Sequence, residues 1–472
     1  MANFLSLDLG SSKIKALICR ESGEIIKSAE KEIMPSYKSQ KVEYDPKEFL
    51  KSCFEVLGLV LNDFPEEIDA FCVASQRSSF LFCDSKGEPL TPILSWQDGR
   101  ASELLEKINI SQEETNEITG LYKTPYYSAS KASLLLKEIA SLSSQKILFM
   151  PLPSFLIFHL SFGKYFICDC AIAQRTLLFD AGKGIWSGRL CDIFGISENI
   201  LPKIVPTFLK EPLMLNFNSK KLPLRAMTGD QQAAALPFLD EKTALVNFGT
   251  GAFILGFCGE KFIKIPGILT SVSSAEEKNI SYMLEGTVNS CGTFLKWLEL
   301  KMGIKPHKTS VYGEKTSEIF VIPAIGGIGS PYWDYDTKTS FYGFDAQSGS
   351  QDLVNAALEG IIFLLNESIE VMRKKINFSQ IAVTGGLSDL DYLPSFLSDI
   401  TRLNVFRPKA KEATSLGLSY FTAAKMGFDC RGWEMFNKEK EFSPLFEDSI
   451  IEKKKIKWKN FFSSVRNLNH KK

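Results

Sequence analysis

Residues 4–15, FLSLDLGSSKIK, predict a strand, a tight turn and a second strand, and this hairpin decides the fold. Residues 4–8 are mostly apolar, Gly10 permits a sharp turn, and the apolar segment 15–19 continues as the second strand. A further turn at 21–24 precedes another apolar run. The chain therefore opens with a strand, a glycine turn and a strand.

The turn of this hairpin carries groups that suit an anion. Gly10 lets the backbone approach a ligand closely, and the hydroxyl groups of Ser11 and Ser12 can donate hydrogen bonds. Lys15 adds a positive charge, and Asp8 places a carboxylate at the end of the first strand. A phosphate-binding hairpin is one interpretation, and a plain turn between two strands is the other.

A similar pattern occurs in the second half of the chain. The strand 243–248 leads into the turn Gly249-Thr250-Gly251, and a second apolar strand follows at 252–257. A glycine pair, Gly385-Gly386, closes the strand 380–384. The sequence contains neither the phosphate loop GxxxxGK followed by Ser or Thr nor a strand-linked GxGxxG. Two hairpins about 240 residues apart, with the glycine pair, predict a nucleotide held between two lobes.

Strands and helices alternate along the chain. The sequence Asp-Pro-Lys-Glu at 45–48 is typical of a helix start, and apolar residues recur at helical spacing up to about residue 62. The segment 68–75 is a buried strand, and 352–372 is a long helix with a broad apolar face. This alternation predicts an α/β architecture.

The composition is that of a folded protein with a large core. The chain has 472 residues, which at roughly 150 residues per domain predicts two to three domains. Lysine and arginine number 55, and aspartate and glutamate also number 55, so the formal net charge is zero. Because no global positive charge attracts a nucleic acid or an anionic membrane, both are disfavoured as partners.

Targeting signals and metal-binding patterns are not found in the sequence. The first residues lack a cationic stretch and are interrupted by Asp8, and no apolar run reaches the roughly 18 residues of a membrane helix. Ten scattered cysteines and three histidines, His159, His307 and His470, show no zinc-binding spacing, so we expect reduced thiols in the cytoplasm. The lysine-rich segment from Lys453 favours an amphipathic terminal helix over a nucleic-acid contact.

Two further stretches carry side chains that suit catalysis on a polyol. In the segment 228–235, TGDQQAAA, Asp230 is placed to accept a proton from a hydroxyl group, and the alternative is a helix N-cap. The segments 75–78 and 96–98 combine a planar cation, amides and an indole face, which suit a small polyol. A surface salt bridge explains Arg77 equally well.

The order of the stretches along the chain carries more information than any one of them. They are LDLGSSKIK (7–15), SQRSS (75–79), PLTPILSWQD (89–98), GDQQAAA (229–235), NFGTGAF (247–253), IPAIGGIGSPYWD (322–334), VTGG (383–386) and EATSLGLSYFTAA (412–424). In this order they resemble the FGGY family of carbohydrate kinases, from about residue 4 to 427, and within it they are most similar to the glycerol kinases. The resemblance implies an α/β, two-lobed, actin-like ATPase fold of the ribonuclease H type, with duplicated domains and a cleft between them.

The resemblance also implies an activity, the phosphorylation of a hydroxyl group of a small polyol or sugar with ATP and Mg²⁺. Asp230 would be the catalytic base, and Asp8 would hold the magnesium ion. The residues expected to bind ATP are Gly10, Ser11, Ser12, Lys15, Gly249, Thr250, Gly251, Gly292, Lys296, Gly385 and Gly386. The residues expected to line the substrate pocket are Gln76, Arg77, Trp96, Tyr126, Asp230, Gln231 and Phe253.

The same resemblance suggests how the chain is divided. Residues 1–236 would form an N-terminal domain with the substrate pocket and the first hairpin, and 237–430 a C-terminal domain that binds ATP. Residues 431–472 would form a C-terminal tail. The expected partner is the small polyol or sugar, with no nucleic acid and no membrane, and a homodimer is left open.

Some positions depart from the family pattern. Ser78 stands where glycerol kinases carry a glutamate that accepts hydrogen bonds from the polyol, and Leu390 stands where an amide often lies near adenine. The substrate is therefore open between glycerol and a ketose such as xylulose or ribulose. A non-catalytic regulator that binds nucleotide or sugar is the remaining alternative, although Asp8 and Asp230 are both present.

Overall fold

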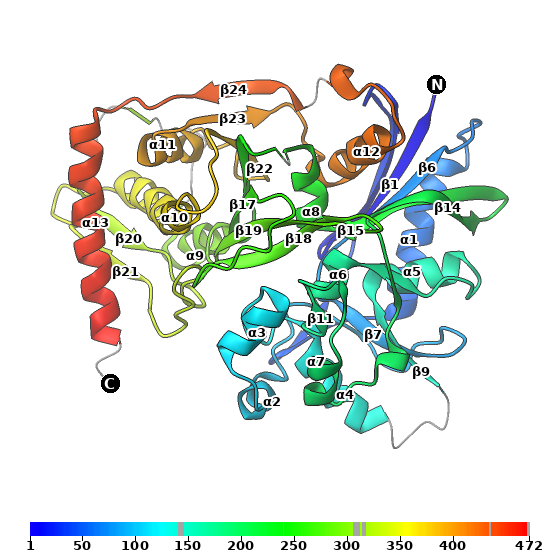
Figure 1. Cartoon of the computed structure of the whole chain (residues 1–472). Helices are drawn as coiled ribbons and strands as arrows, with labels where there is room; N and C mark the ends of the chain where they lie inside the picture. Colours follow the sequence, from blue (N-terminus) through cyan, green and yellow to red (C-terminus); the bar gives the residue numbers. More distant parts are fainter. Residues whose placement is uncertain (140–145, 239, 305–311, 314–317, 434–435, 470–472) are drawn as a thin grey trace.

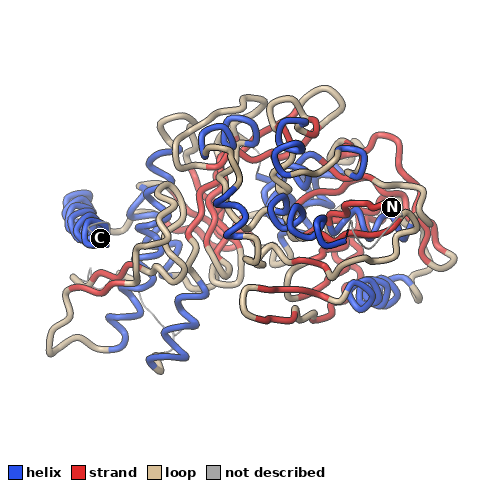
Figure 2. The backbone as a smooth tube through the Cα atoms, turned by 90° about the horizontal axis from the view of Figure 1, so that it is seen from below, coloured by secondary structure: helices blue, strands red, loops and turns tan. Residues whose placement is uncertain are grey.

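A computed structural model describes residues 1–139, 146–238, 240–304, 312–313, 318–433 and 436–469 of the chain. Two large sheets lie side by side with helices packed against them, and a smaller sheet lies below the first (Figure 1). Seen from below, the strands form several groups across the molecule, and helices lie between and beside these groups (Figure 2). The expected α/β architecture is confirmed. His307 and His470 lie outside the described residues.

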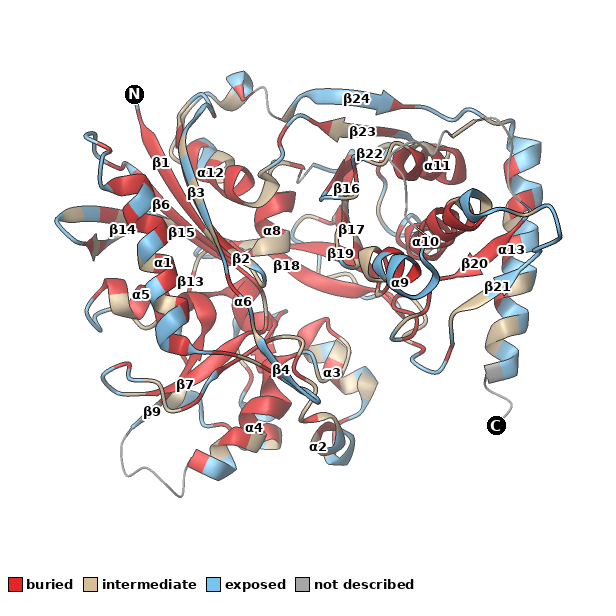
Figure 3. Cartoon of the chain, turned by 180° about the vertical axis from the view of Figure 1, so that it is seen from behind, coloured by how far each residue is buried: buried red, intermediate tan, exposed pale blue. Residues whose placement is uncertain are grey.

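The first sheet is built from residues that precede position 230. Its six strands are, in spatial order, β14 (Phe208–Phe217), β15 (Lys220–Gly229), β6 (Ala70–Ser75), β1 (Asn3–Leu9), β2 (Lys13–Arg20) and β3 (Ile25–Glu32). β1, β6 and β15 are parallel, and the other three strands are antiparallel to their neighbours. The apolar strands β1 and β6 are buried, whereas the polar outer strand β3 is half exposed (Figure 3).

The second sheet repeats this arrangement. Its seven strands are, in spatial order, β18 (Leu269–Ala275), β19 (Ile280–Val288), β17 (Ala252–Phe257), β16 (Thr243–Phe248), β22 (Gln380–Thr384), β23 (Asn404–Pro408) and β24 (Lys438–Phe442). The antiparallel set β16, β17 and β19 corresponds to β1, β2 and β3, and the parallel strands β22 and β23 correspond to β6 and β15. This repeat confirms the duplication that the two glycine hairpins predict.

The remaining strands of the described structure form smaller sheets. A five-stranded sheet below the first contains, in spatial order, β4 (Ser36–Lys38), β5 (Lys41–Tyr44), β8 (Ile93–Leu94), β7 (Phe80–Asp84) and β9 (Ile147–Pro151). Three two-stranded sheets pair β10 (Ile167–Asp169) with β13 (Lys203–Val205), β11 (Phe179–Asp180) with β12 (Ile185–Trp186), and β20 (Phe320–Ile322) with β21 (Ser340–Tyr342).

Some of the helices begin at a residue whose side chain caps them. Helix α1 (Pro46–Leu61) starts as predicted, because the Asp45 carboxylate accepts hydrogen bonds from the backbone amides of Lys47 and Glu48 at 2.9 Å each. The remaining helices are α2 (Ser102–Lys107), α3 (Gln112–Thr119), α4 (Ser128–Ile139), α5 (Leu152–Leu160), α6 (Cys170–Gln174), α7 (Gly188–Phe194), α8 (Asp230–Ala235), α9 (Gly292–Met302), α10 (Ser350–Met372), α11 (Tyr392–Thr401), α12 (Ala413–Lys425) and α13 (Asp448–Asn469), with 3-10 turns at Glu198–Ile200, Leu236–Phe238 and Cys430–Gly432.

The segment 431–472, expected to be a tail, contributes to the second lobe. Strand β24 forms an edge of the second sheet, and α13 lies at the side of the molecule (Figures 1 and 2). The buried Trp458 of α13 stacks on Phe363 of α10 with ring centroids 4.6 Å apart. Most of its lysines, among them Lys453, Lys457 and Lys459, are exposed, so α13 is the predicted amphipathic helix, although Lys454 is buried and pairs with Glu359 of α10 at 2.7 Å. None of the helices in the described part of the chain has the length and apolar character needed to cross a membrane.

Candidate functional site

The carboxyl ends of the parallel strands β1, β6 and β15 lie next to one another in the first sheet. In the strand register, Asp8 of β1 lies opposite Ala74 of β6, and Gly229 of β15 lies opposite Ser75, the last residue of β6. Residues at or just beyond the ends of parallel strands meet at one edge of a sheet. This edge brings together Asp8, Arg77 and Asp230, three of the residues selected from the sequence.

Asp230 is the first residue of α8. Strand β15 continues through Gly229, which is therefore the N-cap residue, so the interpretation of Asp230 as an N-cap is wrong. Its Oδ1 accepts a hydrogen bond from the backbone amide of Gln231 at 2.7 Å and lies 3.7 Å from Nε of Arg77. Burial raises the pKa of Asp230, while Arg77 and the Gln231 amide oppose this shift. A carboxylate with a raised pKa is a stronger general base.

Asp8 has the properties expected of a group that holds a cation. Burial raises the pKa of Asp8 to about 8, and the charge of Asp230 acts in the same direction. Its Oδ1 is buried and has no hydrogen-bond partner within the described residues. Across the described ranges, no three His, Cys, Asp or Glu side chains converge on one metal position. These features fit Mg²⁺, which binds one or two carboxylates and completes its shell with water and phosphate oxygens.

The first hairpin is held in place by its neighbours. The side-chain amide of Gln76, which is 2% exposed, donates to the carbonyl of Gly10 at 3.1 Å and accepts a hydrogen bond from Ser79 Oγ at 3.0 Å. Lys15 lies directly opposite Asp8 across the hairpin and forms ion pairs with Glu412 at 3.1 Å and Glu30 at 3.4 Å. Gln76 and Lys15 thus bind protein groups in this structure.

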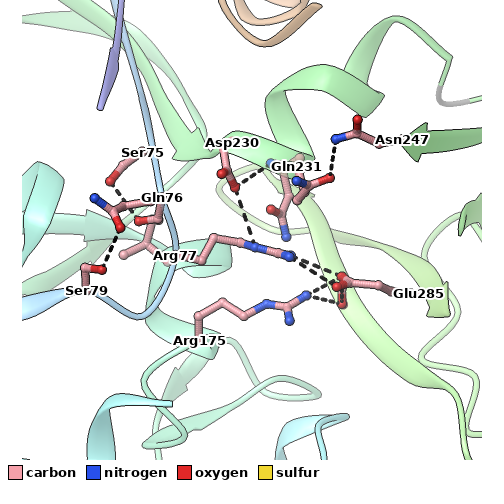
Figure 4. A network of polar contacts seen from close by, with 12 residues as sticks. Ser75, Gln76, Arg77, Ser79, Arg175, Asp230, Gln231, Asn247 and Glu285 are labelled. Carbon is pink, nitrogen blue, oxygen red and sulfur yellow. Dashed lines mark hydrogen bonds and ion pairs between the residues drawn. The ribbon is translucent and has the colours of Figure 1, made fainter. Parts of the chain in front are cut away.

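Arg77 lies in a network of buried charges rather than in a surface salt bridge (Figure 4). Its two terminal nitrogens each donate to Glu285 of β19 at 3.1 Å. Arg175 donates to the same carboxylate, as does Ser271 Oγ at 2.9 Å. Burial acts to raise the pKa of Glu285, but the charges of Arg175 and Arg77 outweigh it and hold the pKa at about 2. Glu285 and Arg175 were not among the site residues expected from the sequence.

A sequence signal for Glu285 did exist. Its strand, ISYMLEGTV (280–288), is otherwise rich in apolar and small residues and carries one formal charge in its interior. A charged side chain in a buried strand requires a partner of opposite sign. Such a residue is a candidate for a long-range ion pair even when its partner cannot be named from the sequence.

The expected pocket residues Trp96 and Tyr126 lie together although thirty positions separate them in the chain. Their ring centroids are 6.0 Å apart, in an edge-to-face arrangement. The buried Lys131 of α4 donates from Nζ to the carbonyls of Ser95 at 3.0 Å, Trp96 at 3.4 Å and Tyr126 at 3.0 Å. Burial lowers the pKa of Lys131 to about 7. Lys131 therefore ties the two aromatic segments to one another.

The residues from the second half of the chain that were expected to bind ATP lie around the second hairpin. Gly292, at the start of α9, donates from its amide to the carbonyl of Gly249 at 3.0 Å, and Thr293 donates to Thr250 at 3.1 Å. The amide of Leu387, next to the glycine pair 385–386, donates to Phe248 at 3.2 Å. These bonds bring together three glycine-rich turns that are far apart in the chain, and the exposed Lys296 lies one turn into α9.

One side-chain bond connects this hairpin to the first lobe. Asn247 Nδ2 donates to Gln231 Oε1 at 3.1 Å, and Gln231 directly follows Asp230 (Figure 4). Phe253, expected to line the pocket, lies opposite Asn247 in the register of β16 and β17. The proposed base and the glycine hairpin of the other lobe thus belong to one site.

Comparisons with known proteins agree with this geometry. The models for the N-terminal and C-terminal domains of the FGGY family of carbohydrate kinases match residues 3–237 and 244–426. The chain belongs to this family. As an FGGY kinase it is an ATP-dependent phosphotransferase that acts on an alcohol group of a polyol or sugar.

Relatives of this FGGY kinase are similar over nearly their whole length. A glycerol kinase from Thermococcus onnurineus (strain NA1) is 30% identical over 485 residues, and the match covers 96% of both chains. A glycerol kinase from Bacillus subtilis (strain 168) is 28% identical over 492 residues, with 98% of both chains covered.

Solved structures of FGGY kinases share the fold. The crystal structure of Plasmodium falciparum glycerol kinase with ADP is 25% identical, with a TM-score of 0.90 and 98% of both chains covered. A xylulose kinase from Lactobacillus acidophilus shows the fold at 20% identity, with a TM-score of 0.85 and 99% of both chains covered. The two-lobed, actin-like ATPase fold expected from the sequence is thereby confirmed.

Proposed function

We propose that this kinase transfers the terminal phosphoryl group of ATP to a hydroxyl group of glycerol, at the sheet edge formed by Asp8, Arg77 and Asp230. One observation carries the proposal: a candidate base and a carboxylate with one buried oxygen that has no partner in the described structure lie at the ends of parallel strands of one sheet. The glycine hairpin of the other lobe is tied to the residue after the base. This arrangement suits in-line transfer between a nucleotide and an alcohol.

Asp230 would accept the proton of the attacking hydroxyl group, since its side chain remains 30% exposed to a ligand and its pKa is raised. Arg77 would orient the hydroxyl groups of the acceptor beside Asp230, because its Nε lies 3.7 Å from Oδ1 of that residue. The rings of Trp96 and Tyr126 would cover the carbon atoms of the acceptor, as aromatic side chains do in sugar sites.

ATP would be held by the two glycine hairpins and the glycine pair 385–386, whose backbone amides can approach phosphate oxygens. Asp8 would hold Mg²⁺ through the oxygen that has no partner in the described structure. A magnesium ion bridges phosphate oxygens and neutralises the charge that develops during phosphoryl transfer. The ten unpaired cysteines support a reducing compartment, and we propose a cytoplasmic location.

A ketose is the second candidate acceptor, and Ser78 is the observation that favours it. Ser78 is 8% exposed, and its carbonyl accepts a hydrogen bond from Ser128 Oγ at 3.0 Å. Its short side chain replaces the glutamate of the glycerol kinases, which removes an acceptor for polyol hydroxyl groups and leaves more space. Xylulose and ribulose are acceptors of the size that this extra space suits.

A substrate panel tests the proposal. The purified protein is incubated with ATP and Mg²⁺ and with glycerol, erythritol, xylulose or ribulose in turn, and the phosphorylated acceptor is measured directly. We expect a phosphorylated product from glycerol or from one of the larger acceptors. Thermal shifts with ATP or acceptor in the absence of any product would instead support a non-catalytic regulator.

A further inference from the structure

The charge network around Glu285 joins the two lobes beside the proposed base. Glu285 belongs to the second sheet, whereas Arg77 follows β6 and Arg175 follows α6 in the first half of the chain. The Glu285 carboxylate accepts hydrogen bonds from both arginines (Figure 4). It also accepts one from Ser271 Oγ. A contact between residues 77 and 285 thus crosses from one lobe to the other.

The stability of the fold does not by itself explain this network. The side chains of Glu285 and Arg77 are 1% and 11% exposed, so their charges are largely removed from water. Buried ion pairs pay a desolvation penalty, and well-packed apolar side chains of similar volume often stabilise a protein at least as well. We therefore look for a role of these buried charges other than the stability of the fold.

The geometry shows what the network controls. A guanidinium group has five N–H donors in a rigid plane. Two of the donors of Arg77 bind Glu285, one on each terminal nitrogen, and Nε faces Asp230 at 3.7 Å. Two further N–H groups remain for a ligand. The stem of Arg77 packs over Gly229, where a Cβ atom would lie 2.8 Å from its Cγ and Cδ. The position and the plane of the guanidinium are thus both determined.

We propose that Glu285 is a positioning residue for the acceptor: it holds Arg77 at the distance from Asp230 at which the guanidinium orients the reacting hydroxyl group. This inference rests on the proposed function. Without Glu285, Arg77 is released beside the oppositely charged Asp230, and we expect the two to form a close ion pair that occupies the base. Because Glu285 comes from the second lobe, the acceptor site is complete only when both lobes are in contact.

The test compares four variants in the full chain, two of them at Glu285, with glycerol and the best acceptor of the panel as probes. Glu285→Gln keeps the shape of the side chain and removes its charge. We expect kcat/KM for the acceptor to fall about 100-fold, the effect of misplacing a reacting group by about 1 Å. ADP binding, measured by calorimetry, should change less than about threefold, because the network touches the acceptor side of the site.

Two matched controls separate positioning from packing. Ser271→Ala removes a neutral donor to the same carboxylate, and Arg175→Met removes the second cation while leaving Glu285 bound to Arg77. We expect the fold-loss in kcat/KM of each control to be at least about tenfold smaller than that of Glu285→Gln. This should hold even for a control whose melting temperature falls as much as that of Glu285→Gln. Equal losses in Arg175→Met and Glu285→Gln would overturn the inference, since the network would then act through packing alone.

A shorter acid covers the case in which Glu285→Gln yields no folded protein. Glu285→Asp keeps the charge but withdraws the carboxylate by one methylene group, so it cannot keep both 3.1 Å contacts with Arg77. We expect a smaller loss in kcat/KM, carried mainly by KM for the acceptor. If an active Glu285 variant has the kcat/KM of the parent protein, the inference is overturned and the proposed function stands. If the parent protein itself phosphorylates no acceptor, both are overturned.

Discussion

Asn247 donates a hydrogen bond from Nδ2 to Oε1 of Gln231, at 3.1 Å, and so connects the second glycine hairpin to the residue that follows Asp230. The two residues belong to different lobes: Gln231 directly follows the proposed base, and Asn247 lies two positions before Gly249 of the nucleotide hairpin. A change in the angle between the lobes would therefore strain this bond. Its removal should weaken the alignment of base and phosphate.

Asn247→Ala tests this alignment. A neutral hydrogen bond contributes about 0.5–1.5 kcal/mol, so we expect kcat to fall about threefold to tenfold. Steady-state kinetics with saturating ATP and acceptor measure the change. The exposed Asn460→Ala, on α13, is the control for loss of an amide away from the site, and an equal effect in both variants would exclude a role in alignment.

Asp230→Asn keeps the shape of the side chain but removes the proton acceptor. General base catalysis contributes about 10²–10⁴-fold, so we expect kcat to fall by at least about 10² with little change in ATP affinity. Single-turnover measurements isolate the chemical step. Asp63 is exposed, so Asp63→Asn is the control for an aspartate-to-asparagine change away from the site. Near-parental turnover in Asp230→Asn would rule out Asp230 as the base.

Gly385→Ala should distort the turn that closes β22. The backbone φ of Gly385 is 90°, and a Cβ atom there would lie 2.3 Å from Asn247 Oδ1 and 2.4 Å from the Phe248 carbonyl. We expect a loss of about 1–3 kcal/mol in the free energy of unfolding and a higher KM for ATP. At Gly386 a Cβ atom meets nothing within 4 Å, so Gly386→Ala should change the free energy of unfolding by less than about 0.5 kcal/mol. Equal stability of the two variants would contradict this account of the turn.

Ser78→Glu should shift specificity toward glycerol. The glutamate restores a strong acceptor for polyol hydroxyl groups, and a buried hydroxyl without a partner costs about 1–3 kcal/mol. We expect the ratio of kcat/KM for glycerol to that for the best larger acceptor to rise about tenfold or more. Ser78 has a φ of 65°, so Ser78→Ala controls for strain and side-chain loss at this position. A ratio that stays constant or moves toward the larger acceptor would show that residue 78 does not set specificity.

Glu285 makes the stability of the protein depend on pH. The pKa of its carboxyl group is about 2 in the folded protein and 4.5 ordinarily, so ionised Glu285 stabilises the fold above pH 4.5. This contribution, about 3 kcal/mol, is lost as pH falls from 4.5 to 2. Urea denaturation of the parent and of Glu285→Gln over this range measures it, because other carboxyl groups cancel in the difference. A difference independent of pH would contradict the assignment.

The local elements could be predicted from the sequence with good accuracy. The strand ends at 248 and 384, the start of α1 and the two glycine hairpins agree with the structure. Apolar periodicity, caps and glycine turns act over a few residues, so they are visible in a short stretch of sequence. The α/β architecture follows from the order of these elements, as does the convergence of Asp8, Arg77 and Asp230 once β1, β6 and β15 are parallel neighbours.

The sequence by itself thus determined the elements, their order and the residue types of the site. Only the tertiary structure decided which of these side chains bind to one another. It pairs Arg77 with Glu285 across 208 positions, assigns Gln76 to the first hairpin, and makes Lys131 the link between Trp96 and Tyr126. The physical reason is that the partner of a buried polar group is set by the packing of distant segments, which no local pattern encodes.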